Sequence, residues 1–103
     1  MKLEKVVKSD AKSKKWTAIF CMCKEKSCCA EGDKKKVHFG QENADDYTIT
    51  KDEEQRERYR KRHQKDLRTN DPMRAGYLSY YLLWGDSTSL QQNIKEYKKK
   101  FNL

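Results

Sequence analysis

Alternating apolar and polar positions predict three β-strands in the N-terminal part of the chain. Residues 2–8 mix β-branched valines with charged neighbours, a composition typical of an edge strand. Residues 15–23 carry apolar side chains on both faces, so this strand is expected at the centre of a sheet. Residues 36–39 form a third strand, which ends at Gly40. Because consecutive strands are closely linked, the pattern predicts an antiparallel meander with a cysteine-rich hairpin over residues 21–33.

The period of the pattern becomes helical in the second half of the chain. Thr50 and Glu53 match a capping box, so a first helix is expected to begin with Thr50 as its N-cap. A second helix is expected to open at Asp71 and Pro72 and to be capped by Gly85. On the first of these two helices, a narrow stripe of side chains suited to packing recurs every four residues and consists of Tyr59, His63 and Leu67, so only one side of that helix is expected to be buried.

A third helix is predicted to begin at Ser89, where a second capping box precedes an apolar stripe. The stripe consists of Leu90, Ile94, Tyr97 and Phe101. We therefore expect an α+β fold: a three-stranded antiparallel β-meander followed by three α-helices packed on the sheet. At 103 residues the chain has room for a single domain, with a β half over residues 1–40 and a helical half over residues 50–103.

Composition narrows the class of protein. The chain is 39% charged and 35% hydrophobic, which leaves a modest core, but 11% of it is aromatic, and disordered chains seldom carry so much. Its formal net charge of +8 favours polyanionic partners: nucleic acid, an anionic membrane surface or an acidic protein face. No secretory signal and no apolar run of about 18 residues is visible, so we expect a protein made and kept in a cytoplasm, with no transmembrane segment.

The first predicted helix is the best candidate for a polyanion site. A strongly basic helix can follow phosphates, and Tyr59 can stack on a base. The alternative is a solvated helix stabilised by ion pairs four residues apart, such as Asp52 with Arg56 or Glu54 with Arg58. No helix-turn-helix or zinc-finger pattern predicts sequence-specific readout. The candidate contact residues are Arg56, Arg58, Arg60, Lys61, Arg62 and Lys65.

Four cysteines lie close together in the predicted hairpin: Cys21, Cys23, Cys28 and Cys29. Four thiolates can bind a tetrahedral zinc ion, with His38 as a substitute ligand. However, the usual pairs separated by two residues are absent, and adjacent cysteines are poorly placed to share one metal. The alternatives are a disulfide, which a reducing cytoplasm opposes, and free, partly buried thiols. The sequence leaves all three open.

Acid–base chemistry is the remaining candidate, at His63 and at the neighbouring carboxylates Asp45 and Asp46. Asp46 or Asp52 could orient His63, but a packed histidine bonded to a carbonyl or a carboxylate is the simpler interpretation. Asp46 is expected to bond backbone amides near residues 47–48. An enzyme would need a pocket in which His63, Asp46 and a thiol converge. Since no recognisable catalytic set is present, we expect neither an enzyme nor a bound cofactor.

The second predicted helix has more aromatic residues than one buried face needs. Those that face the sheet are expected in the core, and the surplus predicts a contact with a protein partner, because large exposed aromatic side chains mark interfaces. The candidate interface residues are Tyr77, Tyr80, Tyr81 and Trp84.

A series of landmarks extends over nearly the whole chain. It consists of Lys36-Val37-His38-Phe39-Gly40, Asp46-Tyr47-Thr48, Lys51-Asp52, Arg56, Tyr59, Arg62-His63, Leu82-Leu83-Trp84, Ser89-Leu90, Ile94 and Phe101. In its order and spacing, this series resembles a small uncharacterised family of large DNA viruses of algae and amoebae. The resemblance implies a viral protein packaged in the virion, and it implies no known activity. The cysteine-rich segment over residues 21–29 is not part of the family's pattern.

These observations together predict a non-enzymatic structural component of a large virus particle. It would act as a minor capsid, cement or linker protein, with basic side chains bridging acidic patches of coat proteins and Tyr or Trp anchoring the contacts. The alternative is a basic, DNA-associated virion protein that binds packaged nucleic acid without sequence specificity through residues 56–65. Either role places the protein in the virion, and in the host cytoplasm during assembly.

Overall fold

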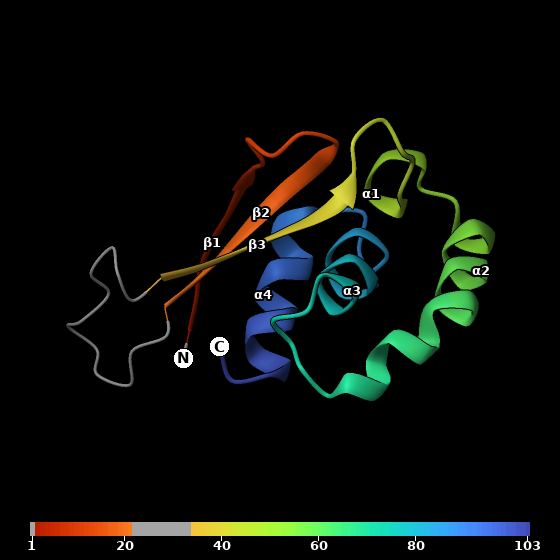
Figure 1. Cartoon of the computed structure of the whole chain (residues 1–103). Helices are drawn as coiled ribbons and strands as arrows, with labels where there is room; N and C mark the ends of the chain where they lie inside the picture. Colours follow the sequence, from red (N-terminus) through yellow and green to blue (C-terminus); the bar gives the residue numbers. More distant parts are fainter. Residues whose placement is uncertain (1, 22–33) are drawn as a thin grey trace.

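Three antiparallel strands form one sheet in the computed structural model, which describes residues 2–21 and 34–103 (Figure 1). They are β1 (Lys2–Lys8), β2 (Lys14–Cys21) and β3 (Lys34–Gln41), and they pair in the order β1–β2–β3. The predicted meander is therefore confirmed, with β2 at its centre. The predicted hairpin beyond Cys21, and with it the end of the predicted second strand, lies outside the described residues.

The two faces of the sheet have different surroundings. Phe20 and Phe39 are fully buried in one core cluster with the helices. Ile19 lies on the opposite face and is still only 8% exposed. The strand register places it between Lys5 of β1 and Lys36 of β3, whose aliphatic stems can cover it. Burial of both faces of β2 explains its apolar composition.

Residues 47–103 form a succession of short helical elements. They are α1 (Tyr47–Thr50), α2 (Glu53–His63), the 3₁₀ turn η2 (Gln64–Thr69), α3 (Ala75–Leu78), the π-helical turn η3 (Ser79–Leu83) and α4 (Leu90–Lys100). Strands followed by helices give the α+β arrangement that the sequence predicts. In the part of the chain that the structure describes, no helix is both long and apolar enough to cross a membrane.

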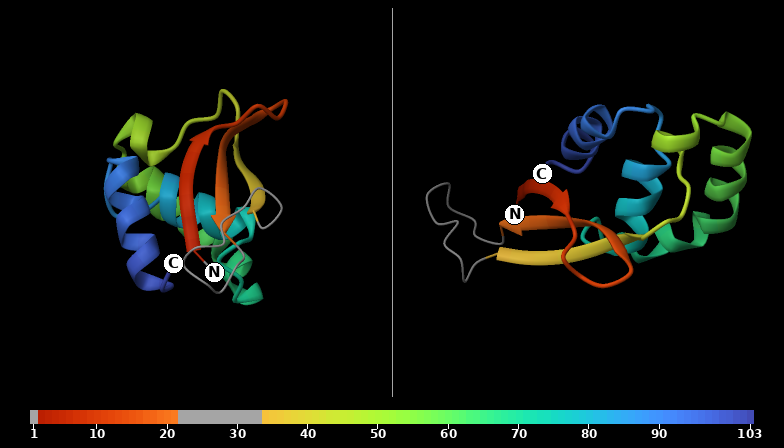
Figure 2. Two further views of the ribbon diagram at one scale, coloured as in Figure 1. Left: turned by 90° about the vertical axis from the view of Figure 1, so that its left-hand side faces the viewer. Right: turned by 90° about the horizontal axis from the view of Figure 1, so that it is seen from above.

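The segment formed by α3 and η3 is the layer that packs on the sheet. Both elements contact β3, and α4 packs against η3. In Figure 1 and in the right-hand view of Figure 2, α3 and η3 lie between the strands and α2. As a result, α2 forms one end of the molecule and turns one side to solvent.

The start of α2 differs from the prediction. Thr50 is not its N-cap, because Asp52 occupies that position and accepts hydrogen bonds from the amides of residues 54–55. Thr50 instead ends α1, which Asp46 caps, and Lys51 then turns the chain at a φ of 57°. A carboxylate is a stronger acceptor than a hydroxyl group, so Asp52, two residues later, caps the long helix.

The second predicted helix starts later than expected. Asp71 and Pro72 form only a turn, in which the Asp71 side chain accepts from the amide of Met73. The helix itself begins after Arg74, which is the N-cap of α3 and contributes no side-chain bond there. The sequence Asp-Pro therefore marks a turn before the helix rather than its first residue.

The end of this helix also differs from the prediction. The backbone amide of Trp84 donates to the carbonyl of Ser79, five residues earlier, and Trp84 is the C-cap of the π-helical turn. Gly85 is therefore not the cap. A Cβ atom on Gly85 would lie 2.2 Å from the carbonyl oxygen of Tyr81, so glycine is needed there for close packing.

Helix α4 follows the prediction at its start and along its apolar stripe. Ser89 caps it, accepting a bond from the amide three residues further on, and Tyr97 of the stripe is 1% exposed. Asn93 is buried on the same side and was not predicted. Its side-chain amide donates to the carbonyls of Leu82 and Ser87 and fixes α4 against the end of η3.

One buried ion pair joins the two halves of the chain. Lys15 of β2 donates to Asp46 at 2.7 Å and to the carbonyl of Ala44 at 2.6 Å. The Asp46 side chain is 2% exposed, and its other oxygen accepts from the amide of Thr48. The predicted bonding of Asp46 to a backbone amide is therefore confirmed, and the pair fixes the start of the helical half on β2.

Candidate functional site

The outward face of α2 and η2 carries five exposed cations. Their positions are three or four residues apart, so they lie on one side of the helical segment. None of the five side chains forms a hydrogen bond or an ion pair with another described residue. We call this surface the basic face; it consists of Arg58, Lys61, Arg62, Lys65 and Arg68.

The order of charges along α2 explains why this segment is helical. Asp52 caps it, Glu53 and Glu54 occupy the first turn, and the basic residues follow toward the C-terminal end, as the helix dipole favours. Cations one turn apart repel each other, however, by a few tenths of a kcal/mol per pair. The helix dipole therefore explains why basic residues lie near the C-terminal end of α2, but it does not explain why five cations share one face.

Two of the six predicted contact residues are turned toward the protein instead. Arg60 donates to the carbonyl of Trp84 at 2.8 Å and to the carboxylate of Asp86 at 2.9 Å. The guanidinium of Arg56 lies over the ring of Tyr47, 4.6 Å from its centroid. Both arginines hold α2 against its neighbours, so the prediction that they contact a polyanion is not supported.

The ion pairs along α2 are not the predicted ones. Glu57 lies 3.1 Å from Arg56 and 3.8 Å from Arg60. The predicted pair of Asp52 with Arg56 does not form, since Asp52 is committed to the N-cap. Glu54 and Arg58 do not pair either. The alternative interpretation, a solvated helix stabilised by ion pairs, therefore does not hold for the outward side of α2.

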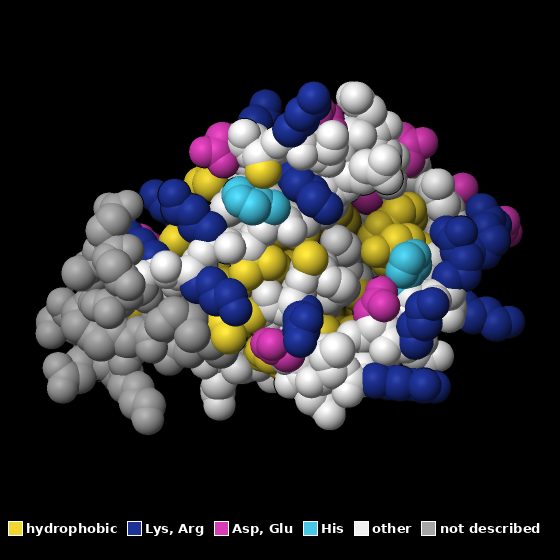
Figure 3. All heavy atoms as spheres, viewed as in Figure 1, with side chains coloured by type: hydrophobic (Ala, Val, Ile, Leu, Met, Phe, Trp, Pro, Cys, Tyr) yellow, Lys and Arg dark blue, Asp and Glu magenta, His cyan; other side chains and the backbone are white. Residues whose placement is uncertain are grey.

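A shallow hollow of about 670 Å³ lies at the lower end of the basic face. Figure 3 shows Lys and Arg side chains gathered along α2 on this end of the molecule. Sequence reasoning missed Arg68, which continues the three-residue spacing beyond Lys65 into the 3₁₀ turn. The hollow has four cations and no carboxylate in its lining: Lys61, Arg62, Gln64, Lys65, Leu67 and Arg68.

Behind the basic face, three stacked rings fix the position of α2. Tyr59 stacks on Trp84 with centroids 4.4 Å apart, and on His63 with centroids 4.1 Å apart. Burial raises the pKa of Tyr59 to about 12, and the nearby carboxylate of Asp66 adds to the rise. The phenol is therefore neutral at physiological pH and acts in packing.

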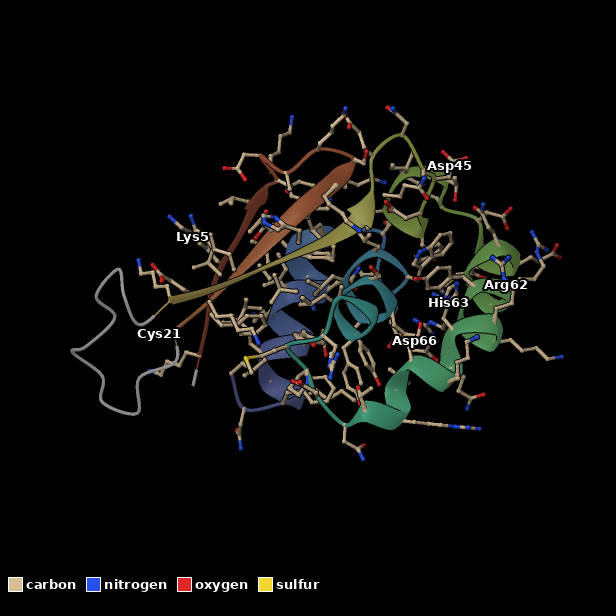
Figure 4. All side chains as sticks on the ribbon, in the orientation of Figure 1. Lys5, Cys21, Asp45, Arg62, His63 and Asp66 are labelled. Carbon is tan, nitrogen blue, oxygen red and sulfur yellow. The ribbon has the colours of Figure 1, made fainter. Side chains whose placement is uncertain are left out.

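His63 is oriented by a carboxylate, but not by one of those predicted. Its Nδ1 lies 3.1 Å from Asp66 Oδ2, and both side chains are about one-third exposed. They extend from α2 and η2 toward α3 (Figure 4), beside a cavity of about 370 Å³ that Tyr59 and Ser79 also line. The prediction of a packed histidine bonded to a carboxylate is confirmed.

Within residues 2–21 and 34–103, no thiol converges with Asp46 and His63 as the candidate enzyme site would require. Asp46 is bound to Lys15 near the start of β2, whereas Cys21 is at the far end of that strand. Six residues of strand separate Lys15 from Cys21, a distance of about 20 Å at 3.3 Å per residue. Figure 4 shows Cys21 and His63 on opposite sides of the molecule. Asp45 is exposed on a loop, where it lines the same cavity as His63 and Asp66.

The four candidate interface aromatics divide into two pairs. Tyr77 is 5% exposed and Trp84 is 7% exposed, so both belong to the core and are not available to a partner. Tyr80 and Tyr81 are partly exposed and line a groove of about 660 Å³ between η3, α4 and α2. The cations of Arg60, Lys99 and Lys100 line this groove, together with the carboxylates of Asp86 and Glu96.

The cysteine prediction can be followed only at Cys21, because Cys23, Cys28 and Cys29 lie outside the described residues. Cys21 is buried, and no cysteine among the described residues is free. His38, the proposed substitute ligand, lies with its Nδ1 2.7 Å from the hydroxyl oxygen of Thr17. Residues 2–21 and 34–103 contain no cluster of three His, Cys, Asp or Glu side chains that could hold a metal ion.

More than half of the chain matches a known family model. Residues 4–63 match a family described as a family of unknown function (DUF5754). The matched segment contains the described sheet except its first two residues, together with α1 and α2, and it ends before the last two residues of the basic face. No curated protein and no solved structure matches the chain.

Proposed function

This chain belongs to the family of unknown function DUF5754, and we propose that it binds the sugar–phosphate backbone of nucleic acid at the basic face of α2 and η2. One observation carries the proposal: five exposed cations share one side of a helical segment, and none is neutralised by another described residue. Like charges so arranged weaken the helix. A bound polyanion removes that repulsion and releases its own counterions.

The way in which α2 is held suits this role. Arg60 anchors it through the carbonyl of Trp84, and the stack of Tyr59 on Trp84 fixes its inner side. The backbone that presents the five cations is thus rigid before the ligand arrives, so binding orders only side chains. Each arginine of the basic face can also bind two oxygens of one phosphate at the same time, through two N–H groups of its guanidinium.

Binding of this kind carries no sequence information. The basic face has only Lys and Arg side chains, which position a protein on phosphates, whereas base recognition needs side chains directed at base edges in a groove. The proposal is therefore a DNA-associated protein that reads charge and not sequence. In the setting that the viral resemblance implies, the ligand is packaged genome, and the protein resides in the virion.

Direct binding to a labelled DNA duplex tests the proposal. The variant Arg62→Gln/Lys65→Gln removes two charges from the centre of the basic face, and Lys95→Gln/Lys98→Gln removes two exposed charges from α4. We expect the first variant to bind at least tenfold more weakly than the wild type at low salt, while the second stays within about twofold. Equal loss in both variants would show that total charge, and not this face, sets affinity.

A second candidate function is a protein–protein linker within the particle. The observation that favours it is the groove beside Tyr80 and Tyr81, where partly exposed rings lie next to cations of Lys99 and Lys100. Aromatic and basic side chains together are typical of anchors for an acidic protein surface. The variant Tyr80→Ser/Tyr81→Ser should then lower incorporation of the protein into purified particles and leave DNA binding unchanged. Normal incorporation of this variant would exclude the linker role for the groove.

A further inference from the structure

The sheet carries a second concentration of positive charge that the helical pattern did not reveal. Its three strands contain eight lysines and one glutamate. Lys15 is bound to Asp46 and Lys34 to Glu4, whereas the other six strand lysines have no ion pair with a described residue. The strands thus have a larger unpaired charge than α2 and η2 together.

Strand register gathers part of this charge on one surface. Lys5 and Lys36 flank Ile19 in one row across the sheet, and Lys2 and Lys34 occupy another row two residues along β2. Because side chains alternate along a strand, all four lie on the side opposite the buried core. We call these four lysines the sheet face. The charge of Lys34 is partly neutralised by Glu4 at 3.2 Å, and no other member pairs with a residue that the structure describes.

The sheet face and the basic face are two surfaces rather than one. The layer formed by α3 and η3 lies between the strands and α2 (Figures 1 and 2). In Figure 4, Asp45 and Asp66 also lie between the strands and the outward side of α2, and Asp45 is exposed. Carboxylates repel phosphates, so this intervening surface does not guide one polyanion from one cluster of cations to the other.

We propose that the sheet face binds a second segment of nucleic-acid backbone, so that one molecule bridges two duplexes. This inference rests on the proposed function of the basic face and extends it from neutralising charge to drawing strands together. The chemistry of the ligand is the same at both surfaces: phosphate oxygens that accept from ammonium or guanidinium groups. Once one segment is bound, the second surface is held near it and captures neighbouring duplex at a raised effective concentration.

A two-duplex capture assay tests this proposal. One duplex is tethered to a surface and saturated with protein, and a second, fluorescent duplex of the same sequence is then added at low salt. The test variant is Lys5→Gln/Lys36→Gln, which removes from the sheet face two exposed charges that have no ion pair with a described residue. The matched control is Lys95→Gln/Lys98→Gln on α4. The mass of the free protein in solution, measured by light scattering, shows whether it is a monomer.

We expect monomeric wild type and the α4 control to capture the second duplex. The sheet variant should still bind the tethered duplex through its basic face, but its capture of the second should fall about tenfold or more. Undiminished capture by the sheet variant would overturn the inference, and so would wild-type protein that binds the tethered duplex and captures nothing. If wild type fails even to bind the tethered duplex, the proposed function itself is overturned.

Discussion

Tyr59 of α2 stacks on Trp84 at the end of η3, with ring centroids 4.4 Å apart and ring planes 10° apart. Trp84 also accepts a hydrogen bond from Arg60, one residue after Tyr59, through its backbone carbonyl. Two consecutive residues of α2 are thus bound to one residue of the neighbouring element. This attachment determines which side of α2 faces inward, and therefore which cations face solvent.

Removal of the Tyr59 ring should loosen this attachment. We expect Tyr59→Ala to lower the free energy of unfolding by about 2–4 kcal/mol, because a largely buried aromatic ring is lost from a stack. Tyr59→Phe keeps the ring and should cost less than about 1.5 kcal/mol. Urea unfolding followed by tryptophan fluorescence measures both variants. Equal stability of Tyr59→Ala and wild type would show that the stack does not hold α2.

Ionisation of Tyr59 should also lower the free energy of unfolding at high pH. Burial raises its pKa to about 12, while in the unfolded chain the pKa is about 10. A raised folded pKa means that the contribution of the neutral phenol is complete below pH 10 or so and is lost as the pH rises through about 12. The loss is at most about 2–3 kcal/mol and is smaller after screening of this partly exposed group.

The Tyr59→Phe variant separates this effect from the titration of lysines in the same pH range. Its ring cannot ionise, so its free energy of unfolding should decline less steeply than that of wild type between about pH 9.5 and 11.5. Chemical denaturation at a series of pH values gives the two slopes. Parallel declines would mean that Tyr59 ionises as readily in the folded protein as in the unfolded chain.

The ion pair of Lys15 with Asp46 should be essential for attaching the helical half of the chain to β2. Asp46→Ala leaves a lysine without its partner and removes the cap of α1, so we expect a loss of about 3–5 kcal/mol. The neighbouring Asp45 is exposed, and Asp45→Asn should change stability by less than about 0.5 kcal/mol. Thermal unfolding of the two variants, Asp46→Ala and Asp45→Asn, measures the difference. Similar melting temperatures for both variants would contradict a structural role for Asp46.

Gly85 should tolerate no side chain. A Cβ atom there would meet the carbonyl oxygen of Tyr81 at 2.2 Å and Asn93 at 2.8 Å, so the backbone must move. We expect Gly85→Ala to destabilise the fold by about 2 kcal/mol or more. Gly76→Ala is the control, since its nearest contact is Asp66 Cβ at 3.1 Å, a distance that a shift of a few tenths of an ångström relieves. A smaller effect at Gly85 than at Gly76 would contradict the observed packing.

Local patterns predicted those parts of the fold in which one signal dominates. The strand order follows from the apolar faces of β2, and α4 follows from Ser89 and its regular stripe. Spacing alone did not decide the start of α2: the capping-box spacing predicted Thr50 as its N-cap, but the carboxylate of Asp52 caps the helix. Asp71 and Pro72 also match a helix start, yet their bonds close only a turn.

The sequence predicted a basic helix at the candidate site, but it did not predict which of the basic side chains are exposed together on one face. Arg56 and Arg60 look like the other cations in sequence, and only tertiary contacts with Tyr47 and Trp84 remove them from the surface. The lysines of the sheet form no helical run, so their clustering depends on register. Lys5 and Lys36, for example, are neighbours only because each pairs with Ile19.

The salt dependence of duplex binding tests the central claim most directly. If the five cations of the basic face each contact a phosphate, log K should fall with log salt at a slope of about −4.5. The variant Arg62→Gln/Lys65→Gln should make that slope shallower by about 1.8, whereas Lys95→Gln/Lys98→Gln should leave it unchanged. The slopes come from fluorescence anisotropy titrations at a series of salt concentrations. A slope unaltered by the first variant, or no binding even at low salt, would contradict nucleic-acid binding by α2 and η2.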